Sequence, residues 1–247
     1  MTNNPIALHT TYARPAKREY KLRVAIAGDL HEPYSKDEYL KAFYKECRAV
    51  KPHVIVQIGD CYDLHNFSTK YLPDPSIRPD YELTEGRKRM VGFWKTAQKA
   101  SPKARCIQIL GNHDARILKY IWAGGRTMAA LADRYSDYRD LWNFPRVETA
   151  KSARDIYEID STLITHGWLM GVPGKHAARF GRNTIVGHTH KQGLVPVQMW
   201  DGVRWEMNVG YMGDEKAPCF SYNASIFVDA TPGFGIVDHN GPRLVTL

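Results

Sequence analysis

The stretch HVIVQIGD at residues 53–60 decides the fold, because it is a short apolar run that ends abruptly in Gly-Asp. Two runs of the same kind flank it, KLRVAIAGD at 21–29 and RCIQILGNHD at 105–114. Such runs are typical of buried strands. Segments 35–51 and 84–101 between them have helical spacing, with Ser35 as the expected N-cap of the first and Pro102 ending the second. This β-α-β-α-β order predicts a largely parallel sheet with right-handed crossovers.

The second half of the chain changes character after a helical stretch expected at 116–135. Strand patterns follow one another at 154–159, 162–167, 183–190, 193–199, 203–209, 224–230 and 233–239. Asp201-Gly202 is a two-residue hairpin signal between two of them. Segment 168–176, which contains Gly and Pro, is expected to be a surface loop. These patterns predict a second sheet, so that residues 21–247 form one domain of two packed sheets flanked by helices.

Composition bounds the function without specifying it. The chain has 247 residues, of which 43% are hydrophobic and 24% charged, as in an ordinary soluble globular protein. No long apolar run predicts a membrane span, and no signal peptide is apparent, so a cytoplasmic protein is expected. Residues 1–20 read as a basic arm. The four cysteines are scattered and are expected to be reduced and buried. A net charge of +8 favours anionic partners.

Polar residues cluster where the predicted strands end. Ligands and catalytic groups gather at the carboxyl ends of strands in α/β sheets, so this placement indicates an active site. Each element alone is common in turns, but five of them in order, with five of the ten histidines, are hard to explain as structural accidents. The residues are Asp29 and His31, Asp60 and Asp63, Asn112, His113 and Asp114, His166, and finally His188 and His190.

In this order the motifs DLH, GDCYD, GNHD, H and GHTH resemble those of the calcineurin-like metallophosphoesterases. The resemblance extends from about residue 22 to 210, and it is greatest to short, uncapped bacterial and phage-type members. It implies an α/β fold, namely a four-layer α/β/β/α sandwich of two mixed sheets flanked by helices. This agrees with the two sheets predicted from periodicity.

The resemblance also implies a centre of two divalent metal ions. One ion would be held by Asp29, His31, Asp60 and His190, and the other by Asp60, Asn112, His166 and His188, with Asp60 bridging. A bridging carboxylate offsets the repulsion between two close cations. Imidazole and oxygen ligands without thiolate suit manganese, which is the expected metal, with iron, zinc, cobalt or nickel as alternatives.

The implied reaction is hydrolysis of a phosphomonoester or phosphodiester. Hydroxide bridging the two metals would attack phosphorus, and His113 would protonate the leaving oxygen as general acid. Asp63 matches the family's carboxylate partner, which would raise the pKa of that histidine. Arg116, two residues after GNHD, is either a clamp on a phosphate oxygen or a surface arginine at the start of a helix.

A basic segment leaves the substrate class open. Residues 87–105 contain seven Lys and Arg residues and no acid. This is either a solvated helix face or a track for a phosphate backbone formed by Arg87, Lys88, Arg89 and Lys95. The second interpretation makes the protein a sequence-tolerant nuclease. A third hypothesis, a non-catalytic scaffold, fits less well because such proteins typically lose metal ligands. The oligomeric state is open.

Overall fold

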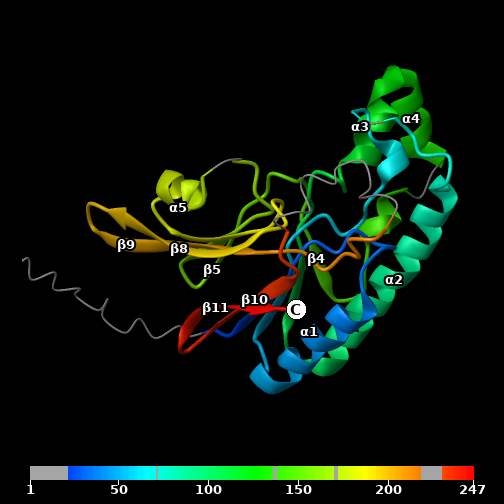
Figure 1. Ribbon diagram of the computed structural model, residues 1–247. Coiled ribbons are helices and arrows are strands. Elements are labelled where there is room, and N and C mark those ends of the chain that lie inside the picture. Colours follow the sequence, from blue (N-terminus) through cyan, green and yellow to red (C-terminus); the bar gives the residue numbers. More distant parts are fainter. Residues whose placement is uncertain (1–21, 71, 136–137, 170–171, 218–229) are drawn as a thin grey trace, which may run out of the picture.

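The computed structural model describes residues 22–70, 72–135, 138–169, 172–217 and 230–247 (Figure 1). The predicted basic arm at 1–20 lies outside these residues. A six-stranded sheet is formed by β1 (Val24–Ala27), β2 (Val54–Gln57), β3 (Arg105–Gln108), β4 (Val147–Thr149), β10 (Gly233–Asp238) and β11 (Gly241–Thr246). Its order is β11-β10-β1-β2-β3-β4. The four strands from β1 to β4 are parallel, as the β-α-β pattern predicted, and β10 and β11 are antiparallel additions.

The second sheet has five strands, β5 (Tyr157–Ile159), β6 (Thr162–Ile164), β7 (Asn183–Val186), β8 (Gln192–Met199) and β9 (Gly202–Val209). Their order is β5-β6-β7-β9-β8, with β6, β7 and β9 parallel and the two edge strands antiparallel to their neighbours. Both sheets are therefore mixed, which confirms the predicted fold class.

Alternation along the strands builds two apolar layers. In β1, Val24 and Ile26 point between the sheets and join a cluster with Ile185 and Met207 of the second sheet. Ala25 and Ala27 point the other way, into a cluster that includes aromatic side chains of the helices. Because successive side chains of a strand face opposite sides, one short apolar run serves both layers. Complete burial of such side chains contributes about 1.5–3 kcal/mol each.

Helices cover the outer faces of the two sheets. Helices α1 (Asp37–Val50) and α2 (Pro79–Ala100) lie along the six-stranded sheet, whereas the short α5 (Lys175–Phe180) lies on the opposite outer side against β8 and β9 (Figure 1). In α2, Met90, Trp94 and Ala97 are buried while Lys95 and Lys99 are exposed, as the spacing predicted. Further helical segments are η1 (His65–Phe67), α3 (Arg116–Ala123), α4 (Gly125–Tyr135) and η2 (Tyr138–Trp142).

Several local expectations were wrong. Ser35 does not cap α1; its hydroxyl donates to Glu32 Oε1 at 2.6 Å, and Lys36 occupies the N-cap position. Helix α2 begins at Pro79, five residues before the predicted start, because proline is well suited to the first helical position. The helix expected at 116–135 is divided at Gly124 into α3 and α4.

Other differences concern turns and strands in the second half. The hairpin exists, but the pairing of Met199 with Gly202 makes Trp200 and Asp201 its turn residues. The segment 168–176 was expected to be a loop, but α5 begins within it at Lys175. The strands β4 and β11 were not predicted. The predicted strand at 224–230 falls almost wholly outside the described residues. Cys47, Cys61 and Cys106 are free and buried as predicted, and Cys219 also lies outside. No helix in the described part of the chain combines the length and apolarity needed to traverse a bilayer.

Candidate metal centre

The seven predicted ligands come from loops that follow five strands. Asp29 and His31 follow β1, Asp60 follows β2, Asn112 follows β3, His166 follows β6, and His188 and His190 follow β7. The structure brings them together at one end of the two sheets. Six of them and His113 form three overlapping groups, in each of which the potential ligand atoms lie within 4.8 Å of one another: Asp29, His31 and His190; His31, Asp60 and His113; and Asp60, His166 and His188.

The first group converges on the Nε2 atoms of two histidines. His31 Nε2 lies 2.9 Å from His190 Nε2, which in turn is 3.5 Å from Asp29 Oδ2. The other ring nitrogen of His31, Nδ1, is 3.0 Å from Asp63 Oδ1. A hydrogen bond from Nδ1 to a carboxylate fixes the tautomer and leaves Nε2 available as a metal ligand. The carboxylate of Asp63 therefore orients the predicted ligand His31.

The second group is arranged around His166. Its Nε2 lies 3.2 Å from Asp60 Oδ2 and 3.2 Å from Asn112 Oδ1, so the predicted amide ligand is in place. Its Nδ1 is 3.1 Å from the carbonyl oxygen of Ile58, which again directs Nε2 inward. The ring of His188 lies 5.1 Å from that of His166, centroid to centroid. Asp60 belongs to both sides of the cluster, as a bridging carboxylate must.

The backbone at the ligands is held in an uncommon conformation. His31, Asp60, His188 and His190 have φ values of 52°, 47°, 71° and 58°, in the left-handed region that non-glycine residues seldom adopt. Such conformations cost on the order of 1–3 kcal/mol each and gather at functional sites. Here they turn each side chain back toward the strand ends.

Two motif glycines are required by close packing against the carboxylates. A Cβ on Gly111 would lie 2.0 Å from Asp60 Oδ1, and one on Gly187 would lie 2.4 Å from Asp29 Oδ1. Since real side chains do not tolerate such contacts, only glycine fits at either position. The glycines of GNHD and GHTH thus let the backbone approach the carboxylates.

The charges of the cluster are strongly interdependent. Burial alone would raise the pKa of Asp60, but His166 and His113 hold it well below its usual range. Burial opposes protonation of His166, yet Asp60 and Asp29 raise its pKa to about 9. Burial raises the pKa of Asp29 to about 7. Burial and the charge of His166 lower the pKa of His188 to about 4. A proton on His166 thus supplies the positive charge that stabilises the ionised Asp60 carboxylate. A bound metal cation would supply that charge instead.

Buried atoms left without partners support the fit to a metal ion. Asp29 Oδ1 and His188 Nδ1 are both buried and form no hydrogen bond with any described residue. Burying such atoms unpaired is costly unless another ligand satisfies them. Carboxylate, imidazole and amide donors converge here without thiolate, a donor set suited to first-row divalent metals. The residues present therefore fit the predicted pair of cations.

His113, Asp63 and Arg116 form a hydrogen-bonded unit beside the ligands. His113 Nδ1 lies 3.1 Å from Asp63 Oδ1 and 3.0 Å from the Asp63 carbonyl oxygen, so the predicted pair is in contact. An Arg116 amino group lies 2.9 Å from His113 Nε2, and another donates to the Asp63 carbonyl oxygen at 2.8 Å. Arg116 is only 8% exposed, which rules out the surface-arginine interpretation.

The expected effect of Asp63 on His113 is outweighed in this arrangement. Burial lowers the pKa of His113, and the Arg116 guanidinium lowers it further, although Asp60 and Asp63 act in the opposite direction. The direction is therefore opposite to the predicted one, because burial of the ring, together with the cation against Nε2, outweighs the effect of the two carboxylates on the pKa of His113. The ring accepts a hydrogen bond from Arg116 and keeps its proton on Nδ1.

The sequence model described as calcineurin-like phosphoesterase matches residues 22–177. The chain belongs to this family. The match confirms the resemblance inferred from the motifs. It ends before His188 and His190, which β7 brings to the same cluster.

Two proteins of phages match this chain over nearly its whole length. The chain is 25% identical to the gene 54 protein of Mycobacterium phage D29, with 91% of this chain and 93% of that protein covered. The gene 54 protein of Mycobacterium phage L5 gives the same identity and coverage. Among solved structures, it is similar to YfcE, a phosphoesterase from E. coli (15% identity, TM-score 0.40, 87% and 88% covered). It is also similar to vacuolar protein sorting 29 from Cryptosporidium parvum (14% identity, TM-score 0.41, 91% and 96% covered).

Asp114 has a role that the sequence analysis missed. An aspartate just before a helix is a common N-cap, but α3 begins without a side-chain cap. The Asp114 carboxylate instead accepts hydrogen bonds from the backbone N–H groups of Gly111 at 2.7 Å and Tyr62 at 3.1 Å, and from the thiol of Cys61 at 2.8 Å. Asp114 thereby fastens the loop after β3 to the loop after β2, and with it Asn112 to Asp60.

The predicted basic track on α2 is only partly available. Arg89 Nε donates to the buried Glu32 carboxylate at 2.7 Å, and its amino group donates to Asp37 at 2.9 Å. Arg87 lies over the ring of Phe144, 4.6 Å from its centroid. These two arginines therefore stabilise the fold. Of the four predicted phosphate contacts, only Lys88 and Lys95 are exposed.

Proposed function

We propose that this protein is a metal-dependent hydrolase of phosphoesters whose cluster binds two divalent cations. The observation that carries the proposal is that Asp60 belongs to two of the three ligand groups, once with His31 and once with His166 and His188. Family membership supports the same conclusion. The scaffold hypothesis is disfavoured because all seven ligand positions are retained and assembled.

In this proposal Asp29, His31, Asp60 and His190 hold one cation. Asp60, Asn112, His166 and His188 hold the other. When bound, the cations lower the pKa of water and neutralise charge on the phosphoryl oxygens. The donor set suits manganese, iron, zinc, cobalt and nickel, and manganese is the metal proposed here.

The protein's own part in proton transfer centres on His113. Asp63 holds the ring through Nδ1, so Nε2 faces the cluster, 4.0 Å from Asp60 Oδ2. Nε2 can carry a proton to a leaving oxygen only after Arg116 has turned away from it. We infer that a phosphoryl oxygen draws the Arg116 guanidinium off His113, since this planar fork binds such oxygens well. Arg116 would then hold the substrate. His113 Nε2, once free of Arg116, would take up a proton from solvent and give it to the leaving oxygen, and Nδ1 would keep its own proton toward Asp63.

Leaving-group dependence tests the acid role. p-Nitrophenolate leaves readily without protonation, whereas an alkoxide does not. With Mn²⁺ present, the hydrolysis of p-nitrophenyl phosphate and bis(p-nitrophenyl) phosphate should be compared with that of their alkyl analogues. General acid catalysis contributes about 10²–10⁴-fold, so His113→Ala should lose roughly that factor on alkyl esters and much less on aryl esters.

The same assay tests the metal centre. Asp60→Asn should abolish hydrolysis of every ester, because it removes the shared carboxylate. Equal losses on aryl and alkyl esters in His113→Ala would refute the acid role, and full activity of Asp60→Asn would refute the metal centre. Faster hydrolysis of the monoester by the wild type would identify a phosphatase, and faster hydrolysis of the diester would identify a phosphodiesterase.

A further inference from the structure

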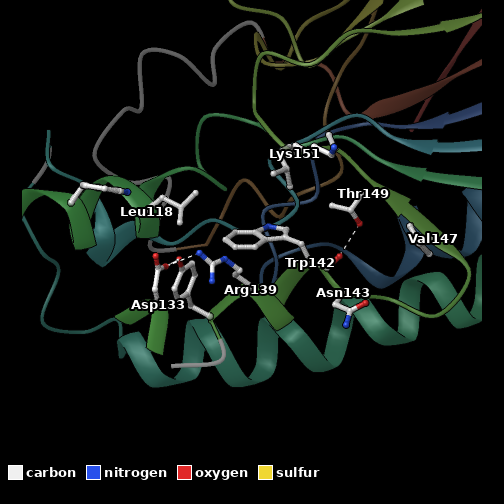
Figure 2. Close-up of a pocket in the computed structure, with 12 residues that line it drawn as sticks. Leu118, Asp133, Arg139, Trp142, Asn143, Val147, Thr149 and Lys151 are labelled. Atoms are coloured by element: carbon white, nitrogen blue, oxygen red, sulfur yellow. Dashed lines mark hydrogen bonds and ion pairs between the residues drawn. The ribbon is translucent and has the colours of Figure 1, made fainter. Parts of the chain in front are cut away.

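One pocket of the protein lies outside the proposed metal centre. It is bounded by α3, α4, η2 and β4, and Figure 2 shows its lining residues. Its volume is about 620 Å³, within the range that small-molecule sites usually have. None of the proposed metal ligands lines it, and the proposed mechanism does not use it.

Aromatic side chains form much of the lining. Trp122, Tyr138 and Trp142 all border the pocket. Trp122 is 62% exposed, although tryptophan is buried to a large extent on average. Rings at the border of an open pocket offer faces on which a planar ligand can stack.

Trp142 also offers an unused hydrogen-bond donor. The residue is only 8% exposed, and its Nε1 is buried without a partner among the described residues. In Figure 2 this nitrogen lies on the edge of the indole that faces Lys151. Buried indole N–H groups usually have an acceptor, so the pocket lacks one that a ligand would bring.

Two cations complete the lining. Arg139 is paired with Asp133, which also accepts from the Tyr138 hydroxyl. The ammonium of Lys151 is exposed and forms no ion pair with any residue in the described ranges. Lys151 is therefore the group most available to an anion.

Two contacts connect the pocket with the loops that carry the proposed metal ligands. Leu110, in its lining, directly precedes the GNHD motif that supplies Asn112. Tyr62, between Asp60 and Asp63, packs against Trp142 with ring centroids 6.4 Å apart and donates its hydroxyl to the Leu141 carbonyl oxygen. A ligand in the pocket would thus lie against loops that carry metal ligands.

We propose that this pocket binds a nucleotide unit of the substrate, with the base stacked on the aromatic residues and a phosphate near Lys151. The assignment rests on the proposed function and names its substrate class. Inorganic phosphate would leave the aromatic faces unused, and a purely apolar ligand would leave the Trp142 N–H unpaired. A nucleotide offers a base that stacks on the rings, acceptors for the Trp142 N–H and a phosphate for the Lys151 ammonium. It can come from a free nucleotide or from a single-stranded nucleic acid.

Binding measured without turnover tests the proposal. The full-length protein is titrated calorimetrically in EDTA with AMP, ribose 5-phosphate and a dodecamer of deoxyadenylate. AMP should bind saturably and ribose 5-phosphate at least about tenfold more weakly, because stacking on aromatic residues is lost. Trp122→Ala and Lys151→Ala should each weaken AMP binding by about tenfold. Trp142→Phe, which keeps an aromatic ring but removes the N–H, should weaken AMP binding about three- to tenfold.

Matched controls use the same residue types elsewhere on the surface. Trp200, 96% exposed at the tip of the β8–β9 hairpin, and Lys41 on α1 are far from the lining in the chain and contribute nothing to it. Trp200→Ala and Lys41→Ala should bind AMP as the wild type does. A dodecamer that binds more tightly than AMP identifies nucleic acid as the source, and equal affinity identifies the free nucleotide.

The proposal is overturned if AMP does not bind saturably, if ribose 5-phosphate binds equally well, or if the pocket variants retain wild-type affinity. Its failure can be told from that of the proposed function, because metal-dependent hydrolysis of p-nitrophenyl esters is measured separately. Nucleotide binding without metal-dependent hydrolysis would leave the pocket as a nucleotide-binding site but overturn its assignment to the substrate of a phosphoesterase.

Discussion

Replacement of Asp63 by asparagine should damage metal binding and catalysis together. One atom, Asp63 Oδ1, lies 3.0 Å from His31 Nδ1 and 3.1 Å from His113 Nδ1. It therefore orients a proposed ligand and the proposed acid at once. Asparagine has nearly the same shape but no charge, so its oxygen accepts more weakly from the two rings, and its N–H₂ group would take the place of Oδ2, which lies 3.8 Å from the Arg116 guanidinium.

The expected magnitude follows from these two contacts. Loss of a carboxylate that orients a metal-bound histidine typically costs 10–100-fold in metal affinity or activity, so Mn²⁺ affinity should fall by about that factor through His31. At saturating Mn²⁺, a misplaced His113 should lower kcat further, by up to about 10²-fold, part of the 10²–10⁴-fold that general acids supply. The loss of kcat should be larger on alkyl than on aryl esters.

Calorimetric titration with Mn²⁺ and steady-state hydrolysis measure the two effects separately. Glu82→Gln is a matched control, since Glu82 is also buried and, among the described residues, accepts hydrogen bonds from the backbone N–H groups of His65 and Asn66 rather than from a predicted ligand. This control should keep metal affinity within about threefold. Wild-type metal affinity and kcat in Asp63→Asn would refute the reasoning. An equal loss in Glu82→Gln would show that general damage to the fold explains the result.

Three further predictions concern protons, packing and charge. The pKa of Asp29 is about 7 and that of His166 about 9, so protons compete with the metal ion for these groups. The Mn²⁺ affinity should therefore rise from about pH 6 to pH 9, and binding should release protons. Calorimetric titrations in two buffers that show no proton release would contradict this. Gly111→Ala should weaken Mn²⁺ binding at least about tenfold because its Cβ would lie 2.0 Å from the shared aspartate, whereas Gly92→Ala, in open space, should bind normally by the same calorimetry. Arg89→Met leaves a buried carboxylate unpaired and should lower the free energy of unfolding by about 3 kcal/mol in urea titrations; a change under about 1 kcal/mol would contradict it.

The central fold was predictable because its signals are local. The strands β1, β2 and β3 are continuous apolar runs, and helical spacing between them fixes a parallel order. The strand β4 has only three residues, none of them fully buried, so no pattern marks it. The helix α5 has six residues, and the N–H groups of Gly174, His176 and Ala177 at its start donate to Glu206, about thirty residues later. A contact of that kind leaves no trace in local sequence.

The candidate site divides in the same way. The ligand types and their order along the chain were sufficient to predict which side chains meet, because strand ends place them at one edge. The contacts between their neighbours could not be predicted. These contacts depend on how the buried space is filled. Examples are the contact of Arg116 with His113, the link that Asp114 makes between two loops, and the pairing of Arg89 with Glu32. Spacing along the chain does not encode those partners.

Anomalous X-ray diffraction from crystals grown with Mn²⁺ tests the central claim most directly. The proposal predicts two anomalous peaks about 3.5–4 Å apart, one bound by Asp29, His31 and His190 and one by Asn112, His166 and His188, with Asp60 between them. No peak at these residues, or a single peak that does not touch Asp60, would contradict the two-metal centre.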